Sequence, residues 1–157
     1  MYSNEIICKV LKYIDININT KLTIEDISKY VNYNRYYLMR LFKRELNISI
    51  FDYINILRIY NSTRELLNNK DKSLLRVAMN SGFYYEEYFS EIFKKVLGIT
   101  PSTYKKILNR NINITDKELS IYMNNYSNIT SIIDKINKYK TNILPKAYPT
   151  RKLSIFK

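Results

Sequence analysis

The feature that most constrains this chain is a repeat within its own sequence, with a spacing of about 50 residues. The stretch Leu41–Ser49 returns at Ile92–Thr100, and residues 24–33 correspond to residues 74–83. One residue is inserted between the two stretches in the second copy. Two copies are too few for a solenoid, which needs at least about three repeats to bury its core. They indicate a duplicated supersecondary unit.

Each copy reads as a short helix, a tight turn and a second helix. In the first unit, about 22–46, Thr23 and Asp26 form a capping-box pattern, and Asn34 is suited to cap the second helix. In the second unit, about 73–97, apolar residues again recur at helical spacing. Two such units in a basic chain favour helix-turn-helix motifs. A plain bundle of helices with no DNA role is the alternative.

The remaining segments complete an all-α fold with seven helices in a domain over residues 1–110. A linker helix is expected at about 49–69, an opening helix at 4–16, and a last helix from Thr100, a cap followed by proline, to Leu108. The fold class is therefore two helix-turn-helix subdomains joined by a long linker helix. A partly helical C-terminal extension follows. With 2 Gly and 3 Pro, the chain lacks the turn residues that a β-sandwich or barrel needs.

The extension, residues 111–157, is basic and carries two expected helices. One spans 116–124 with Thr115 as its cap. The other is amphipathic, ends near Lys140 and has a stripe of isoleucines: Ile129, Ile132, Ile133 and Ile136. A short strand at Leu153–Phe156 is also considered. The extension has four open roles, namely packing on the N-terminal domain, dimerisation, a remnant of an effector domain, or phosphate contacts by Lys135, Lys138 and Lys140.

Composition narrows the classes of function. The chain has 26 basic and 14 acidic residues, a net charge of +12, and such an excess attracts polyanions because binding phosphates releases counterions. It has no histidine and one cysteine, Cys8, which excludes a disulfide within the chain and argues against a metal site or a cofactor. The acidic pair Asp52 and Glu65 implies no catalytic site, so an enzyme is not expected. No apolar run is long enough to span a membrane, and a cytoplasmic protein is expected.

Residues 22–106 resemble the DNA-binding region of AraC/XylS-type transcriptional regulators. The most specific marks are Gly82-Phe83 before the second recognition helix and Thr100-Pro101 with Tyr104 after it. The chain is most similar to the short, single-domain activators of that family. The resemblance implies monomeric binding to double-stranded promoter DNA, with two recognition helices in successive major grooves about 34 Å apart. It also implies activation through contact with RNA polymerase.

The resemblance carries site residues onto the first recognition helix. Tyr36, Met39 and Arg40 occupy its base-reading positions, and an arginine there can donate two hydrogen bonds to guanine. Phosphate contacts are expected from three further cations: Arg35, Lys43 and Arg44. A packing role for Tyr36 and an ion-paired role for Arg44 are the alternatives.

The second recognition helix departs from the family pattern. Its DNA-facing candidates are Tyr85, Glu86, Glu87, Tyr88, Glu91, Lys94 and Lys95. Residues 85–97 have a net charge of −1, whereas residues 34–46 have +3, and Tyr85 replaces the usual serine cap. Glutamate can accept a hydrogen bond from cytosine, but phosphates repel it. The first recognition helix is therefore expected to dominate base readout. The second helix docks weakly or binds a protein, unless two of its glutamates merely complement the helix N-terminus.

The sequence thus predicts a sequence-specific DNA-binding regulator, an activator. The rival is a protein-interaction module on the same scaffold, which would bind polymerase or another regulator through its acidic second unit. Dimerisation through the extension stays open, as do the operator sequence and any effector.

Overall fold

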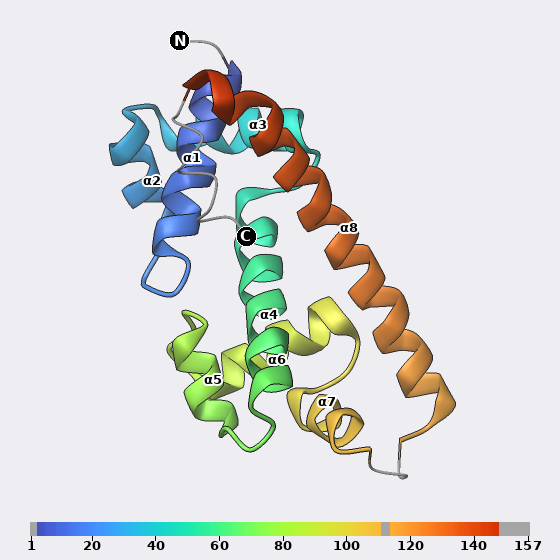
Figure 1. Ribbon diagram of the computed structural model, residues 1–157. Helices are drawn as coiled ribbons and strands as arrows, with labels where there is room; N and C mark the ends of the chain where they lie inside the picture. The colour runs from blue at the N-terminus through green and yellow to red at the C-terminus, as the bar shows by residue number, and fades with distance from the viewer. Residues whose placement is uncertain (1–2, 111–113, 148–157) are drawn as a thin grey trace. The chain divides into compact units, whose positions relative to one another are not determined.

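The computed structural model describes residues 3–110 and 114–147, with side chains placed as far as Asn142, and within these residues it contains only helices (Figure 1). The helices are α1 (Ser3–Asn17), α2 (Ile24–Val31), α3 (Arg35–Leu46), α4 (Ile50–Asn68), α5 (Leu74–Asn80), α6 (Glu86–Leu97), α7 (Pro101–Leu108) and α8 (Asp116–Ala147). The all-α expectation is confirmed, and seven helices precede residue 110 as expected.

Side chains cap the N-terminal ends of several helices at positions that fit the sequence pattern. The Thr23 hydroxyl accepts the backbone N–H of Asp26 at 3.1 Å, and the Asp26 carboxylate accepts the backbone N–H of Thr23 at 3.3 Å. Asn34 accepts two backbone N–H groups of the first turn of α3, and Ser73 and Thr100 cap α5 and α7. These bonds satisfy N–H groups that have no partner inside a helix, so they fix each starting residue.

Residues Asp116–Ala147 of the C-terminal extension form one continuous helix, so the expectation of two helices ending near Lys140 is wrong. Thr115 and Glu118 form a reciprocal cap, as expected for Thr115, but α8 then runs without interruption to Ala147. The polar stretch around Asn125 does not break it, because the Asn125 amide donates to the carbonyls of Leu97 and Ile121 at 3.2 and 2.9 Å. The strand considered at Leu153–Phe156 lies outside the described residues.

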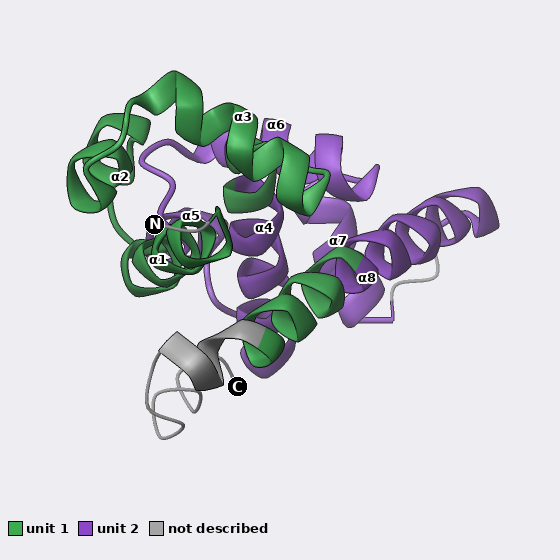
Figure 2. Ribbon diagram, turned by 90° about the horizontal axis from the view of Figure 1, so that it is seen from above, with its two compact units in different colours: residues 1–54, 132–157 green, residues 55–131 purple. Residues whose placement is uncertain are grey.

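The chain divides into two compact units (Figure 2). Unit 1 comprises residues 1–54 and 132–157, and unit 2 comprises residues 55–131. Each unit contains one helix-turn-helix: α2 and α3 in unit 1, α5 and α6 in unit 2. Helices α4 and α8 contribute residues to both units, so the extension is distributed between them.

Unit 1 has a core built from α1, α2 and α3, with α1 packed against both of the others. The rings of Phe42 and Tyr53 lie 6.0 Å apart in this core. Cys8 is buried, and burial raises the pKa of its thiol to about 11. Two isoleucines of the expected stripe, Ile133 and Ile136, are buried in the same unit.

A buried ion pair also joins α8 to α1 in unit 1. The Nζ atom of Lys140 lies 2.7 Å from Oδ2 of Asp15. A phosphate contact by Lys140 is therefore wrong, because its ammonium group is buried and already bound to a carboxylate. Packing on the N-terminal domain describes this part of the extension.

Unit 2 has an aromatic core. Successive ring centres lie 5.3 to 5.7 Å apart along a row formed by Phe83, Phe89, Phe93, Tyr104, Tyr122 and Tyr126. The buried hydroxyl of Tyr104 donates to the carbonyl of Thr63 at 3.2 Å. Ile129 joins this cluster from α8, and Ile59 and Leu66 join it from α4. Leu67, on the other side of α4, is half exposed.

Two glycines have a positive φ, a backbone conformation that would be strained for most other residues. Gly82 has φ +93° in the turn before α6, and Gly98 has φ +79° after α6. A Cβ atom on Gly98 would lie 2.4 Å from Cγ2 of Ile121 and 2.8 Å from Nδ2 of Asn125. Gly98 therefore allows α8 to pack closely over the end of α6.

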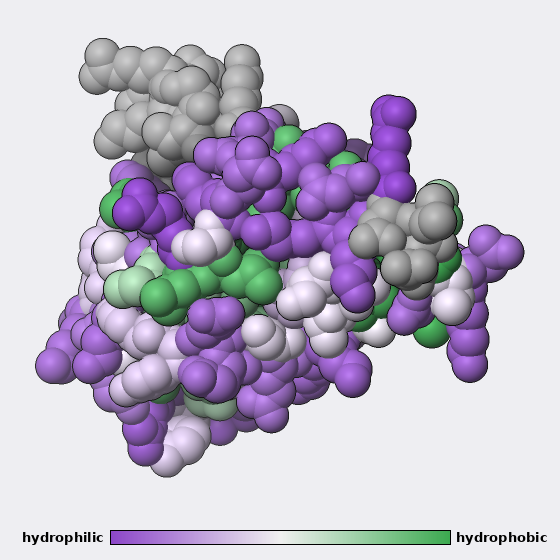
Figure 3. All heavy atoms as spheres, turned by 90° about the horizontal axis from the view of Figure 1, so that it is seen from below, coloured by the Kyte–Doolittle hydropathy of each residue, from purple (hydrophilic) through white to green (hydrophobic). Residues whose placement is uncertain are grey.

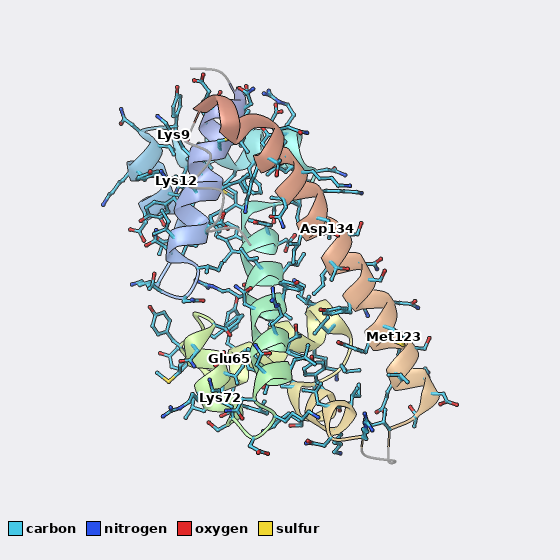
Figure 4. The ribbon with its side chains drawn as sticks, in the orientation of Figure 1. Lys9, Lys12, Glu65, Lys72, Met123 and Asp134 are labelled. Atoms are coloured by element: carbon cyan, nitrogen blue, oxygen red, sulfur yellow. The ribbon has the colours of Figure 1, made fainter. Side chains whose placement is uncertain are left out.

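Glu65 has a structural role that explains part of the acidic pair seen in the sequence. Its Oε1 atom accepts hydrogen bonds from Nζ of Lys72 at 2.7 Å and from Nδ2 of Asn80 at 2.8 Å. Figure 4 shows Glu65 and Lys72 close together at the end of α4. Glu65 thus ties the segment before α5, and the end of α5, to the linker helix.

Candidate nucleic-acid interface

Helix α3 presents a basic face to solvent. It buries Leu38, Leu41 and Phe42 against unit 1, which turns the predicted site residues outward. Five of these are exposed and Met39 is half-buried; the exposed ones are Arg35, Tyr36, Arg40, Lys43 and Arg44. Tyr36 has 56% of its surface open to solvent, which is compatible both with base contact and with the packing role considered for it. The first unit therefore brings all six predicted residues onto the outer side of one helix.

Arg35 is held by its neighbours. Its Nη1 atom lies 2.5 Å from Oε1 of Glu25 on α2, and its Nη2 atom donates to the Tyr36 hydroxyl at 2.9 Å. Its guanidinium carbon also lies 4.8 Å from the centre of the Tyr36 ring. The pKa of Glu25 is lowered, first by a backbone hydrogen bond and then by Arg35. This small network orients Arg35 and Tyr36 together at the start of α3.

The other cations of α3 differ in their pairing. Arg44 bonds the carboxylate of Glu45 at 3.2 Å and the Ser3 hydroxyl at 3.3 Å, which agrees with the ion-paired alternative. Arg40 and Lys43 form no ion pair with any residue that the structure describes. Their charges face solvent without a compensating carboxylate, so they are the cations of α3 best suited to meet an anion.

Helix α6 presents a different surface. It buries Phe89, Ile92, Phe93 and Leu97. Glu86 is half-buried, and the exposed predicted residues are Tyr85, Glu87, Tyr88, Glu91, Lys94 and Lys95. No ion pair with another described residue involves these charged side chains. Tyr85 occupies the N-cap position and makes no side-chain capping bond, as its replacement of the usual serine predicts.

The sequence analysis missed an apolar surface beside α6. Leu75 and Met79, one turn apart on α5, are half exposed, and so is Tyr84 in the turn. Together with Tyr85 and Tyr88 they form what we call the α5–α6 surface. The sequence pattern could have indicated this surface. Val77 and Ala78 are the buried positions of α5, and helical spacing then leaves Leu75 and Met79 on the other side of the helix. Figure 3 shows how exposed apolar side chains (green) gather between hydrophilic ones on one face of the molecule.

A family model described as a helix-turn-helix domain matches residues 27–107, more than half of the chain. A transcriptional regulator from Chromobacterium violaceum with an AraC-type DNA-binding domain has a solved structure similar to this one. It is 28% identical, with a TM-score of 0.58, over 69% of this chain and 96% of that one.

The chain belongs to the AraC-type helix-turn-helix family.

Curated relatives within this family are named as regulators. The regulatory protein PocR of Salmonella typhimurium is 35% identical over 103 residues, which is 66% of this chain and 34% of PocR. The transcriptional activator AarP of Providencia stuartii is 28% identical over 66% of this chain and 76% of AarP. The chain spans about a third of the length of PocR and of the melibiose operon regulatory protein of Escherichia coli, which is 35% identical over 101 residues. AraC-type proteins are transcriptional regulators and not enzymes, as the sequence predicts.

The AraC-type domain gives the two surfaces their context. The matched range runs from α2 to α7 and so contains both α3 and α6. Helix α1 and all of α8 lie outside it. Among the described residues no helix is both long and apolar enough to cross a membrane.

Proposed function

We propose that this AraC-type chain is a sequence-specific DNA-binding activator of transcription that reads its site mainly through α3. The observation that carries the proposal is the exposed basic face of α3, on which Arg40 and Lys43 have no carboxylate partner among the described residues. A helix of this kind fits the major groove of duplex DNA, where base edges present a distinct pattern of donors and acceptors.

The roles along α3 follow from chemistry and position. Arg40 is suited to donate two hydrogen bonds to guanine O6 and N7. Tyr36 and Met39 are suited to contact thymine methyl groups and sugar edges. Phosphate contacts fall to Lys43, with Arg35 and Arg44 contributing once DNA competes with Glu25 and Glu45 for their guanidinium groups.

Helix α6 contributes less to DNA affinity in this proposal. Lys94 and Lys95 are exposed in its last turn and can approach a phosphate. Glu87 and Glu91 are also exposed, and each would face phosphate repulsion in a groove. A carboxylate gains at most a hydrogen bond from a cytosine amino group in return. Readout by one strong and one weak recognition helix follows from this difference in charge.

We propose that the chain activates transcription, rather than represses it, by contacting RNA polymerase beside the promoter. The support is the family and the relative AarP, which is named as an activator. We expect the chain to bind DNA as a monomer, in the bacterial cytoplasm.

The second candidate function is a protein-interaction module, which the exposed carboxylates of α6 and the apolar side chains next to them favour.

Salt dependence tests the proposal. Affinity for a fluorescent duplex should fall linearly with salt on logarithmic axes, and each phosphate contact adds about 0.9 to the slope. Lys43→Ala should lower that slope by about one contact. Lys117→Ala removes an exposed lysine of α8 and is the matched control, for which no change is expected. Equal losses in the two variants would contradict the proposal, since they would show attraction by overall charge alone.

A further inference from the structure

The α5–α6 surface combines exposed apolar side chains with uncompensated carboxylates. Tyr85 is the most open of its five residues, with 72% of its surface exposed, and the others are about half exposed. A monomer gains nothing from leaving large apolar side chains in water, and a group of them marks an interaction surface. Tyrosine and methionine are also enriched at protein interfaces.

The turn between α5 and α6 connects the two helices that carry this surface. The backbone N–H of Gly82 donates to the carbonyl of Met79 at 3.2 Å, so the turn folds back over the end of α5. The ring of Tyr88 lies 5.9 Å from that of Phe83, which is buried at the turn. The Arg58 guanidinium lies 5.8 Å from the same Phe83 ring. Tyr88 is therefore fixed at the first turn of α6, next to the helix-turn-helix turn.

The charge on this surface favours a cationic partner. Glu87 and Glu91 lie one turn apart on α6 and are exposed, and Glu86 is half-buried beside them. None of the three is neutralised by a described lysine or arginine. Arg76 is the exposed cation on α5. Lys94 and Lys95 lie at the opposite end of α6 from Glu86 and Glu87 and about one turn from Glu91, so the excess of negative charge is greatest at the start of the helix.

We infer that the α5–α6 surface docks a basic, amphipathic segment of another protein. Apolar side chains of such a segment would cover Leu75 and Met79, and its lysines or arginines would pair with the glutamates of α6. Duplex DNA matches this surface poorly, because it offers phosphates to the carboxylates and few apolar groups to the aliphatic side chains. The inference goes beyond the proposed function, since base readout mainly through α3 assigns no role to Leu75 and Met79.

A peptide library provides a defined probe. Random peptides of about 16 residues, long enough for about four helical turns, are displayed and selected on the full chain in about 0.15 M salt. We expect the enriched peptides to carry lysine or arginine together with leucine or aromatic residues. The affinity of a synthetic enriched peptide is then measured by fluorescence anisotropy.

Matched variants separate the charges from the apolar contacts. Glu87→Gln combined with Glu91→Gln should weaken peptide binding about tenfold and reduce its dependence on salt. Leu75→Ser combined with Met79→Ser should weaken it at least as much. The controls in the same unit are Asp71→Asn and Leu67→Ser, which change an exposed acid and an exposed leucine elsewhere. All these positions are exposed, and an unchanged thermal melt verifies folding.

Three results would overturn the inference. The first is enrichment of acidic peptides, or of none. The second is a peptide affinity that the glutamate and apolar variants leave unchanged, including the case in which those variants lose duplex DNA binding and keep peptide binding. The third is self-association in sedimentation that the same variants abolish, which would make the surface an interface between copies of this chain. Arg40→Ala distinguishes the two proposals, because it should weaken DNA binding and leave peptide binding intact.

Discussion

The Nζ atom of Lys140 donates a hydrogen bond to Oδ2 of Asp15 at 2.7 Å, and the Lys140 side chain is only 5% exposed. These residues lie 125 positions apart in the sequence, on α8 and α1. A buried ion pair adds little net stability over apolar residues of the same volume, but removing one partner leaves an uncompensated charge. The pair therefore determines the position at which the C-terminal part of α8 packs on α1 within unit 1, rather than adding much stability.

Lys140→Met should destabilise the protein by about 3 kcal/mol, because it leaves the Asp15 carboxylate buried without a cation. The free energy of unfolding in urea gives this value. Lys138→Met, at an exposed lysine of the same helix, is the control and should have little effect. The double variant with Asp15→Asn and Lys140→Met should recover most of the loss. A loss that persists in the double variant would show that packing, rather than charge, is responsible.

The pKa of Asp15 gives a second, independent test of the same pair. Burial raises this pKa above its ordinary value of 3.8, although Lys140 acts in the opposite direction. The folded state then holds the proton more tightly than the unfolded state, so the contribution of Asp15 to stability falls as pH rises from 3.8 through the raised value. A carboxyl titration followed by NMR should show the raised pKa, and Lys140→Met should raise it further. A pKa below 3.8 would contradict the assignment.

Gly98→Ala should destabilise unit 2 more than the backbone conformation alone requires. The position has φ +79°, and the new Cβ would lie 2.4 Å from Ile121. Asn47→Ala is a matched control, because Asn47 ends α3 as Gly98 ends α6 and also has a positive φ, +57°. We expect a cost of about 1 kcal/mol at Asn47 and about twice that at Gly98. Equal costs in thermal unfolding would show that α8 does not press on this turn.

Glu25→Gln should strengthen DNA binding. Glu25 holds Arg35 in the free protein, so its removal releases a cation at the start of α3 and deletes a negative charge nearby. The expected gain in affinity for a duplex is about threefold, in line with the small energies of exposed ion pairs. Asp71→Asn deletes one negative charge far along the chain and should change the affinity less. An unchanged affinity in Glu25→Gln would mean that Arg35 does not approach DNA.

The first residues of four helices could be predicted from the sequence because N-terminal capping is local. Thr23, Asn34, Ser73 and Thr100 each bond backbone N–H groups within three residues, so residue type and spacing are sufficient information. The outward direction of the α3 residues follows from helical periodicity in the same way. The stripe of Leu38, Leu41 and Phe42 determines which residues remain for solvent.

The continuity of α8 could not be predicted, because tertiary contacts determine it. Asn124 and Asn125 are poor helix formers and favour a break on propensity alone. In the structure Asn125 bonds the carbonyl of Leu97, and Tyr122 and Tyr126 pack beside the aromatic core of unit 2. Likewise, the pairing of Arg35 with Glu25 depends on the angle between two helices, which no spacing in the sequence records.

The most direct measurement is selection of random duplexes by the chain, sequenced and repeated with Arg40→Ala and with Glu91→Ala. We predict one strongly enriched half-site that Arg40→Ala abolishes and Glu91→Ala leaves in place. Two half-sites of equal strength about one turn apart, or about 34 Å, each lost with its own variant, would contradict readout dominated by α3. No enrichment at all would contradict sequence-specific DNA binding itself.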